Sequence, residues 1–385
     1  MNVLQVYKYY YPHVGGIERV IQDLVEGLRH HHRMQILVCT EAARGNSEAV
    51  NGIPVTRAGT FRTYFSVPLS FTYPVLMRRL AADHDVLHFH LPYPFADFTY
   101  LMVRPHGKVV VWWHSDIVRP KRLSRLYRPF LKSFLRKAHA IIVAAPQLID
   151  SSAVLSKFRE KCVVIPIGID TSRFNMDDRV SRRAAQIRNN ARAVVLFIGR
   201  FVYYKGVEYL IEAMQRVDAR LVLVGEGPLE SSLKAQVALM GLEEKVAFVG
   251  RVEEEDIAAY YHASDVFVLP SVENTEAYGI VQLEAMACGK PVISTDLPTG
   301  VSFVNLHEKT GLVVPPRNAE ALADAINGLL GNEPARKALG EFARQRVEAQ
   351  FTKQKMLQSV HALYERVFNG SGGAQAHDTQ TDNKK

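Results

Sequence analysis

The chain has 385 residues, of which 48% are apolar and 22% charged, and its formal net charge is +8. This composition excludes a disordered or fibrous protein, and no apolar run reaches the roughly 18 residues that a membrane-spanning helix needs. Cys39, Cys162 and Cys288 form no C-x-x-C pair, which argues against a disulfide framework and against a thiolate zinc site.

Positive charge is concentrated in the first half of the chain. Residues 1–170 contain 22 Lys and Arg against 12 Asp and Glu, whereas the remaining residues contain 25 against 27. This asymmetry indicates that the first half faces an anionic partner, and the composition leaves open a membrane surface, an anionic lipid carrier or nucleic acid. The opening residues MNVLQVYKYY predict a strand and not a secretory signal, so we expect a cytoplasmic protein.

Short apolar strands alternate with helical patterns along the chain. The first unit consists of a strand at 3–6, a helix with apolar positions from Ile17 to Leu28 on one face, and a strand at 34–40. Further strands are predicted at 86–90, 108–113, 140–145, 162–167, 193–199, 220–225, 245–250, 265–270 and 291–295. The alternation predicts the α/β class, with parallel sheets that are covered by helices on both faces.

A polar and charged stretch at 170–192 separates the two series of strands. We therefore predict two doubly wound, Rossmann-like domains, 1–170 and 171–350, which face each other across a cleft. Ligands in such sheets bind at the carboxyl ends of the strands. A helix is predicted at 351–368, and its return to the first domain is one arrangement that stays open. The polar tail at 369–385 is predicted to be disordered.

Two motifs that follow predicted strands are suited to an anion. Gly15 and Gly16 precede the first helix, where free N–H groups and the helix dipole favour negative charge, although a lone Gly-Gly pair is more often an ordinary tight turn. Arg200 and Lys205 lie in the loop after the strand at 193–199 and can grip a diphosphate, with a solvated basic loop as the alternative.

A dinucleotide fingerprint is incomplete in this sequence. The segment GEGP at 225–228 follows a predicted strand, but the sixth position of its G-x-G-x-x-G frame is Glu230. A dehydrogenase therefore lacks its main support.

Glu276 and Glu284 stand eight residues apart, with Gly279 between them. On one continuous helix they would be separated by about 12 Å along the axis, too far for an acid/base pair. Gly279 instead predicts the start of a helix, with Glu276 in the preceding loop and Glu284 in the second turn. The uncapped N–H groups between the two carboxylates can then bind a ligand diphosphate, and they are those of Ala277, Tyr278, Gly279 and Ile280. Each carboxylate can bind a sugar on one side of the diphosphate. This arrangement suits a nucleotide sugar, and two solvated helix glutamates are the alternative.

The chain resembles family 4 of the retaining GT-B glycosyltransferases over residues 1–365. The resemblance rests on motifs in that family's order and spacing: GGIERV, WWHSD, IPIGIDTSRF, GRFVYYKG, GEGP, LPSVENTEAYGIVQLEAMACGKPVIST and TGLVVPPRN. It implies that Gly15 and Gly16 let the first domain close on the donor diphosphate.

The same resemblance implies roles for further residues. It implies that Glu276 binds hydroxyls of the donor sugar and has a part in catalysis, and that Glu284 binds the ribose. It also implies that Arg200 and Lys205 hold the diphosphate. His114 matches the family's histidine beside the anomeric centre, whereas alone it would be read as a structural residue at a strand end.

More narrowly, VYKYYYPHVGGIE, HFHLPYPFAD and HSDIVRPKRLSRLYRPF look like bacterial O-antigen and exopolysaccharide mannosyl- and rhamnosyltransferases. The likeness implies a retaining, metal-independent hexosyltransferase with no cofactor besides its nucleotide-sugar co-substrate. It also implies a lipid-linked oligosaccharide acceptor, on polyprenyl diphosphate. GDP-mannose is the expected donor, while a UDP-sugar or GDP-rhamnose donor and a sugar-nucleotide epimerase of the same fold stay open.

The segment 119–140 has eight Lys and Arg, no acidic residue and an apolar stripe. Basic amphipathic helices of this kind lie on anionic bilayers, and a helix that packs its stripe on the sheet is the alternative. We expect residues 119–138 to contact the anionic inner face of the cell membrane.

Two other readings are disfavoured by the sequence. Nucleic acid is not an expected partner, because no binding motif is found. The segment DHDVLHFH at 83–90 puts His88 and His90 on one strand face, but no third ligand is evident, so we predict no metal site.

Overall fold

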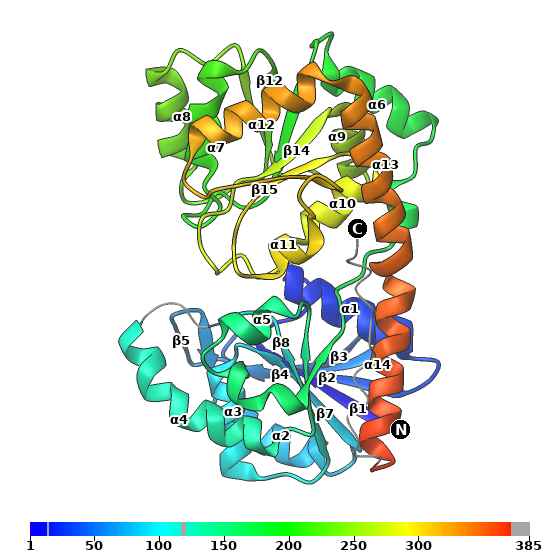
Figure 1. Cartoon of the computed structure of the whole chain (residues 1–385). Coiled ribbons are helices and arrows are strands. Elements are labelled where there is room, and N and C mark those ends of the chain that lie inside the picture. Colours follow the sequence, from blue (N-terminus) through cyan, green and yellow to red (C-terminus); the bar gives the residue numbers. More distant parts are fainter. Residues whose placement is uncertain (14, 117–120, 371–385) are drawn as a thin grey trace.

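The structure is a computed structural model that describes residues 1–13, 15–116 and 121–370 (Figure 1). Two mostly parallel sheets, each flanked by helices, form a lower and an upper domain in that view. The predicted fold class, α/β with two Rossmann-like domains, is confirmed.

The first domain is built on an eight-stranded sheet of order β10-β9-β8-β7-β1-β2-β4-β3. All neighbouring strands are parallel except β3 and β4, which form an antiparallel hairpin at one edge. The strands are β1 (Asn2–Val6), β2 (Arg33–Thr40), β3 (Asn46–Val50), β4 (Ile53–Gly59), β7 (Val86–Leu91), β8 (Lys108–Trp113), β9 (Ala140–Val143) and β10 (Cys162–Val164). The central strands are mainly apolar because helices cover both faces.

Helices cover this sheet, and a small hairpin lies beside it. The hairpin consists of β5 (Arg62–Tyr64) and β6 (Val67–Leu69). The helices are α1 (Gly16–Leu28), α2 (Tyr73–Ala81), α3 (Pro94–Val103), α4 (Lys121–Lys137), α5 (Gln147–Ser151) and the 3-10 helix η1 (Leu155–Lys161). In α1 the apolar side chains recur at helical spacing and are buried against the sheet, as the sequence predicts.

The second domain is built on a six-stranded parallel sheet of order β13-β12-β11-β14-β15-β16. Its strands are β11 (Val194–Ile198), β12 (Arg220–Val224), β13 (Val246–Gly250), β14 (Val266–Leu269), β15 (Val292–Thr295) and β16 (Gly311–Val314). Its helices are η2 (Thr171–Phe174), α6 (Asp178–Arg188), α7 (Val207–Ala213), η3 (Met214–Arg216), α8 (Glu230–Leu239), α9 (Ile257–Ala263), α10 (Ile280–Ala287), α11 (Gly300–Val304), α12 (Ala319–Gly331) and α13 (Glu333–Gln350). Strand order reverses between β11 and β14, and ligands of open parallel sheets bind at such a point.

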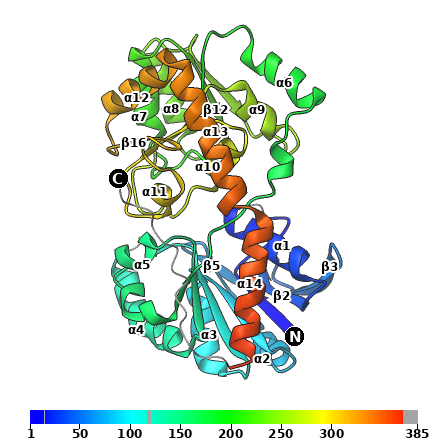
Figure 2. The ribbon, with the colours of Figure 1, turned by 45° about the vertical axis from the view of Figure 1, so that its right-hand side comes forward.

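The last helix, α14 (Lys353–Phe368), leaves the second domain and packs beside α1 of the first (Figures 1 and 2). The chain is tied at this crossing by the Ile169 N–H, which donates to the Phe351 carbonyl at 2.9 Å. Lys353 Nζ also lies 2.9 Å from Asp23 Oδ1 of α1. The C-terminal helix is therefore part of the packing of the first domain.

Two expectations concern regions at the limits of the structure. The predicted disordered tail at 369–385 lies outside the described residues from position 371 onward. Across residues 1–13, 15–116 and 121–370, none of the helices combines the length and the apolar content that crossing a bilayer requires.

Candidate active site

The N-termini of α1 and α10 meet where the two domains face each other. A Cβ atom added to Gly16, the first residue of α1, would lie 3.6 Å from Cδ1 of Ile280, the first residue of α10. A helix N-terminus carries partial positive charge and unpaired N–H groups. Two of them together favour a bound anion, at the position where the sequence predicts one beside Gly15 and Gly16.

Gly279 is the N-cap residue of α10. Its backbone is left-handed, with φ of 72° and ψ of 65°, and a Cβ atom there would lie 2.6 Å from Leu269 Cδ2. Both the conformation and the space therefore require glycine. Glu276 lies in the loop before the helix and Glu284 in its second turn, which confirms the predicted placement.

The loop before α10 is held from two sides. The Gly300 N–H donates to the Ala277 carbonyl at 2.8 Å, and the buried Tyr278 hydroxyl donates to the Ile167 carbonyl at 3.3 Å. Within the described part of the chain, four successive N–H groups donate no backbone hydrogen bond outside the helices: those of Ala277, Tyr278, Gly279 and Ile280. They are the donors that the sequence predicts for a diphosphate.

Lys205 and Glu276 form a nearly buried ion pair. Nζ lies 2.5 Å from Oε2, and the side chains are 10% and 9% exposed. The Ser271 hydroxyl donates to the same carboxylate oxygen at 2.9 Å. Lys205 follows β11 and Glu276 follows β14, so the pair lies at the carboxyl ends of the two strands between which strand order reverses.

Arg200 is exposed at the end of β11, in the same loop as Lys205. The two cations and Glu276 act together on Tyr204, whose pKa is raised, first by burial and then by the Glu276 charge, while Lys205 and Arg200 oppose the shift. The structure therefore gathers Arg200, Lys205 and Glu276 around one loop.

Glu284 lies on the other side of the α10 N-terminus and has a separate partner. The Tyr261 hydroxyl donates to its Oε2 at 2.6 Å. Burial raises the pKa of Glu284, and the Tyr261 hydrogen bond and the charges of Arg173 and Arg19 oppose the shift. Arg19 belongs to α1, and its Nη1 lies 2.5 Å from Glu254 Oε1 of the second domain, so an ion pair joins the two domains.

His114 follows β8 and ends a buried chain of hydrogen bonds. Its Nε2 lies 2.9 Å from His90 Nδ1, and His90 Nε2 lies 2.8 Å from Gln5 Oε1. Gln5 Nε2 donates to the Tyr364 hydroxyl of α14 at 3.1 Å. Because an amide oxygen only accepts, His90 Nε2 carries the proton and His114 Nε2 is the donor to His90. The Nδ1 atom of His114 is then left as an acceptor.

The buried imidazoles of His88, His90 and His114 are neutral at physiological pH. Burial lowers the pKa of His114 and of His88 to about 3, and the His114 charge contributes to the shift of His88. Burial, followed by His88 and His114, holds the pKa of His90 well below its usual range. The predicted common strand face of His88 and His90 is confirmed, because their rings stack with centroids 4.5 Å apart. His88 Nδ1 lies 2.6 Å from the Tyr364 hydroxyl.

A cavity of about 390 Å³ lies at the other edge of the second sheet, with Arg192, Arg220 and Lys245 among its lining residues. These residues stand at the amino ends of β11, β12 and β13. Because ligands of parallel sheets bind at the carboxyl ends of the strands, the edge with Lys205 and Glu276 is the candidate site, and this cavity is not.

Several residues that contact the predicted site were not singled out from the sequence. They are Gln5, Tyr261, Ser271 and Tyr364. For Gln5 a signal exists, since its amide interrupts the apolar run of a central strand and a buried amide needs partners. Tyr364 is one of several buried apolar residues at helical spacing in α14, and no local pattern distinguishes it.

Two Rossmann-like domains with a site between them form the architecture of the GT-B glycosyltransferases. Residues 14–173 match the family described as Glycosyltransferase Family 4, and residues 178–346 match Glycosyl transferases group 1. The chain belongs to glycosyltransferase family 4.

Individual relatives agree with this assignment over almost the whole chain. The chain is 35% identical to O-antigen chain mannosyltransferase C of Escherichia coli, covering 94% of this chain and 98% of the relative. It is 36% identical to D-rhamnosyltransferase WbpZ of Pseudomonas aeruginosa, covering 91% and 92%. The solved structure of Anabaena Alr3699/HepE in complex with UDP has the same fold, with a TM-score of 0.79, 20% identity and coverage of 95% and 100%. The predicted family, fold and glycosyltransferase activity are confirmed.

Proposed function

We propose that the protein transfers mannose from GDP-mannose to a polyprenyl-diphosphate-linked glycan during the synthesis of a bacterial surface polysaccharide, with retention of anomeric configuration. The observation that carries the proposal is the Lys205–Glu276 pair beside the N-terminus of α10. It combines a cation for a diphosphate with a carboxylate for sugar hydroxyls. The similarity to an O-antigen mannosyltransferase supports mannose, and the similarity to a D-rhamnosyltransferase makes GDP-rhamnose the second candidate.

The donor's charge is complementary to this site. The diphosphate takes the N–H groups at the start of α10, with Arg200 and Lys205 as its cations. When Lys205 turns to the diphosphate, the Glu276 carboxylate is released to accept hydrogen bonds from the donor sugar. Glu284 accepts from the ribose hydroxyls. In this proposal side-chain cations meet the charge of the diphosphate, and neither a metal ion nor another cofactor takes part.

The transfer breaks the bond between the anomeric carbon and the diphosphate oxygen. The acceptor oxygen forms its bond to the same face of the sugar, and its proton passes to the departing phosphate oxygen. Negative charge grows on the leaving group, where Arg200, Lys205 and the helix N-terminus stabilise it. His114 is neutral and offers Nδ1 as an acceptor to a sugar hydroxyl, so its role is to orient the donor.

Ligand-dependent thermal unfolding tests the donor. GDP and GDP-mannose, near saturation, are expected to raise the unfolding midpoint by several degrees, because a ligand at about 100 times its Kd adds about 2.7 kcal/mol of stability. UDP, UDP-glucose, UDP-N-acetylglucosamine and NAD are the comparison ligands and are expected to give no shift. A shift with uridine ligands alone would overturn the donor and keep the site, whereas no shift with any of them would overturn both.

In the predicted membrane segment, one part of the apolar stripe is buried and the other part is exposed. Leu131, Phe134 and Leu135 of α4 are buried against the domain, in line with the packing alternative, whereas Leu126 and Phe130 are 72% and 48% exposed. Positions 119 and 120 of the segment lie outside the described residues. One end of the helix therefore offers apolar side chains to a partner.

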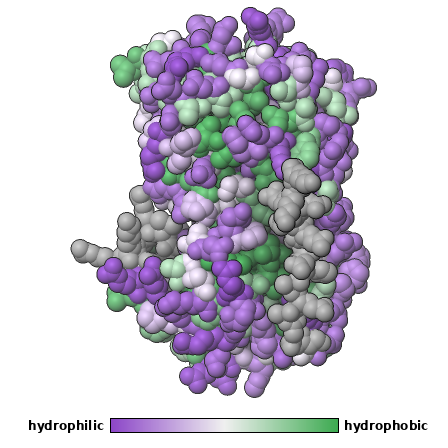
Figure 3. Space-filling view, viewed as in Figure 1, coloured by the Kyte–Doolittle hydropathy of each residue, from purple (hydrophilic) through white to green (hydrophobic). Residues whose placement is uncertain are grey.

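These side chains form an apolar ridge with α3, and we define the ridge by Phe98, Met102, Leu126 and Phe130. Phe98 and Phe130 make an edge contact, with ring centroids 5.9 Å apart. Figure 3 shows hydrophobic atoms at the surface at the lower left, where α4 lies. The same helix α4 carries exposed basic residues: Arg125, Arg128, Arg136 and Lys137. Apolar residues beside cations suit an anionic bilayer, so we propose peripheral binding to the inner face of the cell membrane.

A small cavity of about 60 Å³ lies between α4 and the residues that follow β8. Its lining includes Arg128 of α4 together with Trp113 and Asp116, which flank His114 in the sequence. The Ser152 hydroxyl donates to Asp116 at 2.8 Å. We propose that the lipid-linked acceptor approaches His114 along this side, from the membrane-bound α4.

Liposome flotation tests the membrane surface. The variant Leu126→Ser/Phe130→Ser is expected to lose most of its binding to vesicles with anionic lipid, because it removes two exposed apolar side chains of α4. Leu239→Ser is the matched control, since Leu239 is 88% exposed on α8 of the second domain. Equal flotation of wild type with and without anionic lipid would refute the role of the basic residues.

A further inference from the structure

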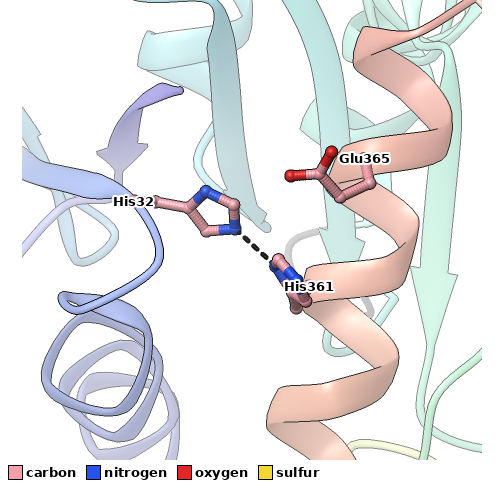
Figure 4. Close-up of side chains that lie close together, drawn as sticks. All are labelled: His32, His361 and Glu365. Carbon is pink, nitrogen blue, oxygen red and sulfur yellow. Dashed lines mark hydrogen bonds between the residues drawn. The ribbon is translucent and has the colours of Figure 1, made fainter.

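A cluster of three potential metal ligands lies at the edge of the first sheet opposite the donor site (Figure 4). His32 directly precedes β2, while His361 and Glu365 lie one turn apart on α14. Nε2 of His32 is 2.8 Å from Nδ1 of His361, and the ligand atoms of all three residues lie within 4.8 Å of one another. In Figure 4 both rings and the carboxylate point toward a common space.

His32 is buried, and one of its ring nitrogens lacks a partner. The residue is 3% exposed. Its Nδ1 has no hydrogen-bond partner among the described residues, whereas most buried polar atoms in proteins are hydrogen-bonded. Imidazole nitrogens are common metal ligands.

We propose that His32, His361 and Glu365 bind Zn²⁺ or a similar divalent transition-metal ion, with the fourth position open to solvent. Two imidazole nitrogens and one carboxylate oxygen are ligands that zinc takes in tetrahedral sites. Ca²⁺ and Mg²⁺ prefer all-oxygen sites. Zinc distances of about 2.0–2.2 Å require ligand atoms about 3.3 Å apart, so the two rings separate slightly and the carboxylate moves in.

The spacing of the ligands gives the site a structural consequence. His361 and Glu365 are four residues apart and share one face of α14, whereas His32 directly precedes β2, 329 positions before His361. A bound ion therefore fastens the returning C-terminal helix to the first domain. Tyr364 lies between the two α14 ligands, and its ring makes an edge contact with His32 at 5.6 Å between centroids.

Zinc titration of the full chain tests the proposal. Protein without an oligohistidine tag is treated with chelator and titrated with Zn²⁺ against a chromophoric chelator. We expect one tight site per chain and a loss of at least about tenfold in affinity for His361→Ala, which removes one of three protein ligands. His31→Ala is the matched control, because the His31 ring also contacts His361, at 4.8 Å, but is not one of the three ligands.

A second variant and the absorption spectrum of bound Co²⁺ distinguish the loss of a metal ligand from a folding defect. Glu365→Gln preserves the size of the side chain and is also expected to weaken binding, while its unfolding midpoint in chelator stays at the wild-type value. Co²⁺ is expected to give the visible absorption of a tetrahedral site in wild type and in His31→Ala only. Substoichiometric binding, or equal affinity in all variants, would overturn the site.

Discussion

Replacement of Lys205 by Met is expected to lower kcat/KM by about 10²–10³-fold, the usual effect of removing one group that stabilises charge in a transition state. Lys205 is the buried cation of the site and the partner of Glu276. Steady-state transfer assays with GDP-mannose measure the loss, and binding of GDP is expected to weaken as well. Activity within about threefold of wild type would remove Lys205 from the donor site.

The same variant has an effect on stability that a double variant separates from the effect on activity. Without Lys205 the buried Glu276 carboxylate is unpaired, which costs on the order of 3 kcal/mol of unfolding free energy. Lys205→Met/Glu276→Gln removes both charges, so we expect it to regain most of that stability in urea unfolding and to remain inactive. Lys234→Met is the control, since Lys234 pairs with Glu230 on the surface of α8 and such pairs contribute about 0.5 kcal/mol or less.

His114→Phe is expected to lower kcat by about 10²-fold while GDP affinity changes by less than about threefold. Phenylalanine keeps the ring that stacks on Trp112, with centroids 5.5 Å apart, but removes the Nδ1 acceptor. GDP affinity is preserved because the groups proposed to bind the diphosphate lie in the second domain and on α1. Wild-type kcat in this variant would contradict an orienting role.

Substitution of Gln5 tests whether the chain of hydrogen bonds from His114 through His90 to Gln5 contributes to catalysis. Gln5→Met removes the amide that defines the protons of His90 and His114, and we expect kcat to fall by about 10- to 100-fold with an unchanged KM for the donor. The nitrogen chemical shifts of His114 are expected to report a mixture of tautomers. Gln35→Met is the control, because Gln35 lies on the neighbouring β2 and its side-chain amide donates to the Thr56 hydroxyl, away from the histidines.

The sequence predicts most of the sheet strands, because buried parallel strands are short apolar runs. It does not reveal the β3–β4 hairpin, whose outer strand NSEAV is mostly exposed and polar at the sheet edge. A local signal was present, since Asn51 and Gly52 both have positive φ at the turn and Asn-Gly is typical of a two-residue hairpin. The four residues of β16 lie within the motif TGLVVPPRN, and they are too few to show the periodicity of a strand.

The parts of the site that lie in one stretch of sequence are predictable. Gly279 marks a helix start between two carboxylates, and a left-handed N-cap explains that glycine. The ion pair of Lys205 with Glu276 is not predictable in this way, because it joins two loops that only the order of strands brings together. The hydrogen bond from Gln5 to Tyr364 joins residues 359 positions apart, and a contact at that separation cannot be predicted from a single sequence.

The late position of Tyr364 in the sequence determines when this residue becomes available during synthesis of the chain. The first sheet is complete once β10 has emerged, yet the tyrosine that bonds to Gln5 follows about 200 residues later, a delay of about 10–40 s at bacterial and eukaryotic rates of translation. During that interval the amide of Gln5 faces the place that α14 will occupy. A nascent chain that stops before Tyr364 would carry every sequence motif of the family and still lack the last partner of its histidine chain. The histidine chain is therefore completed only after α14 has been synthesised.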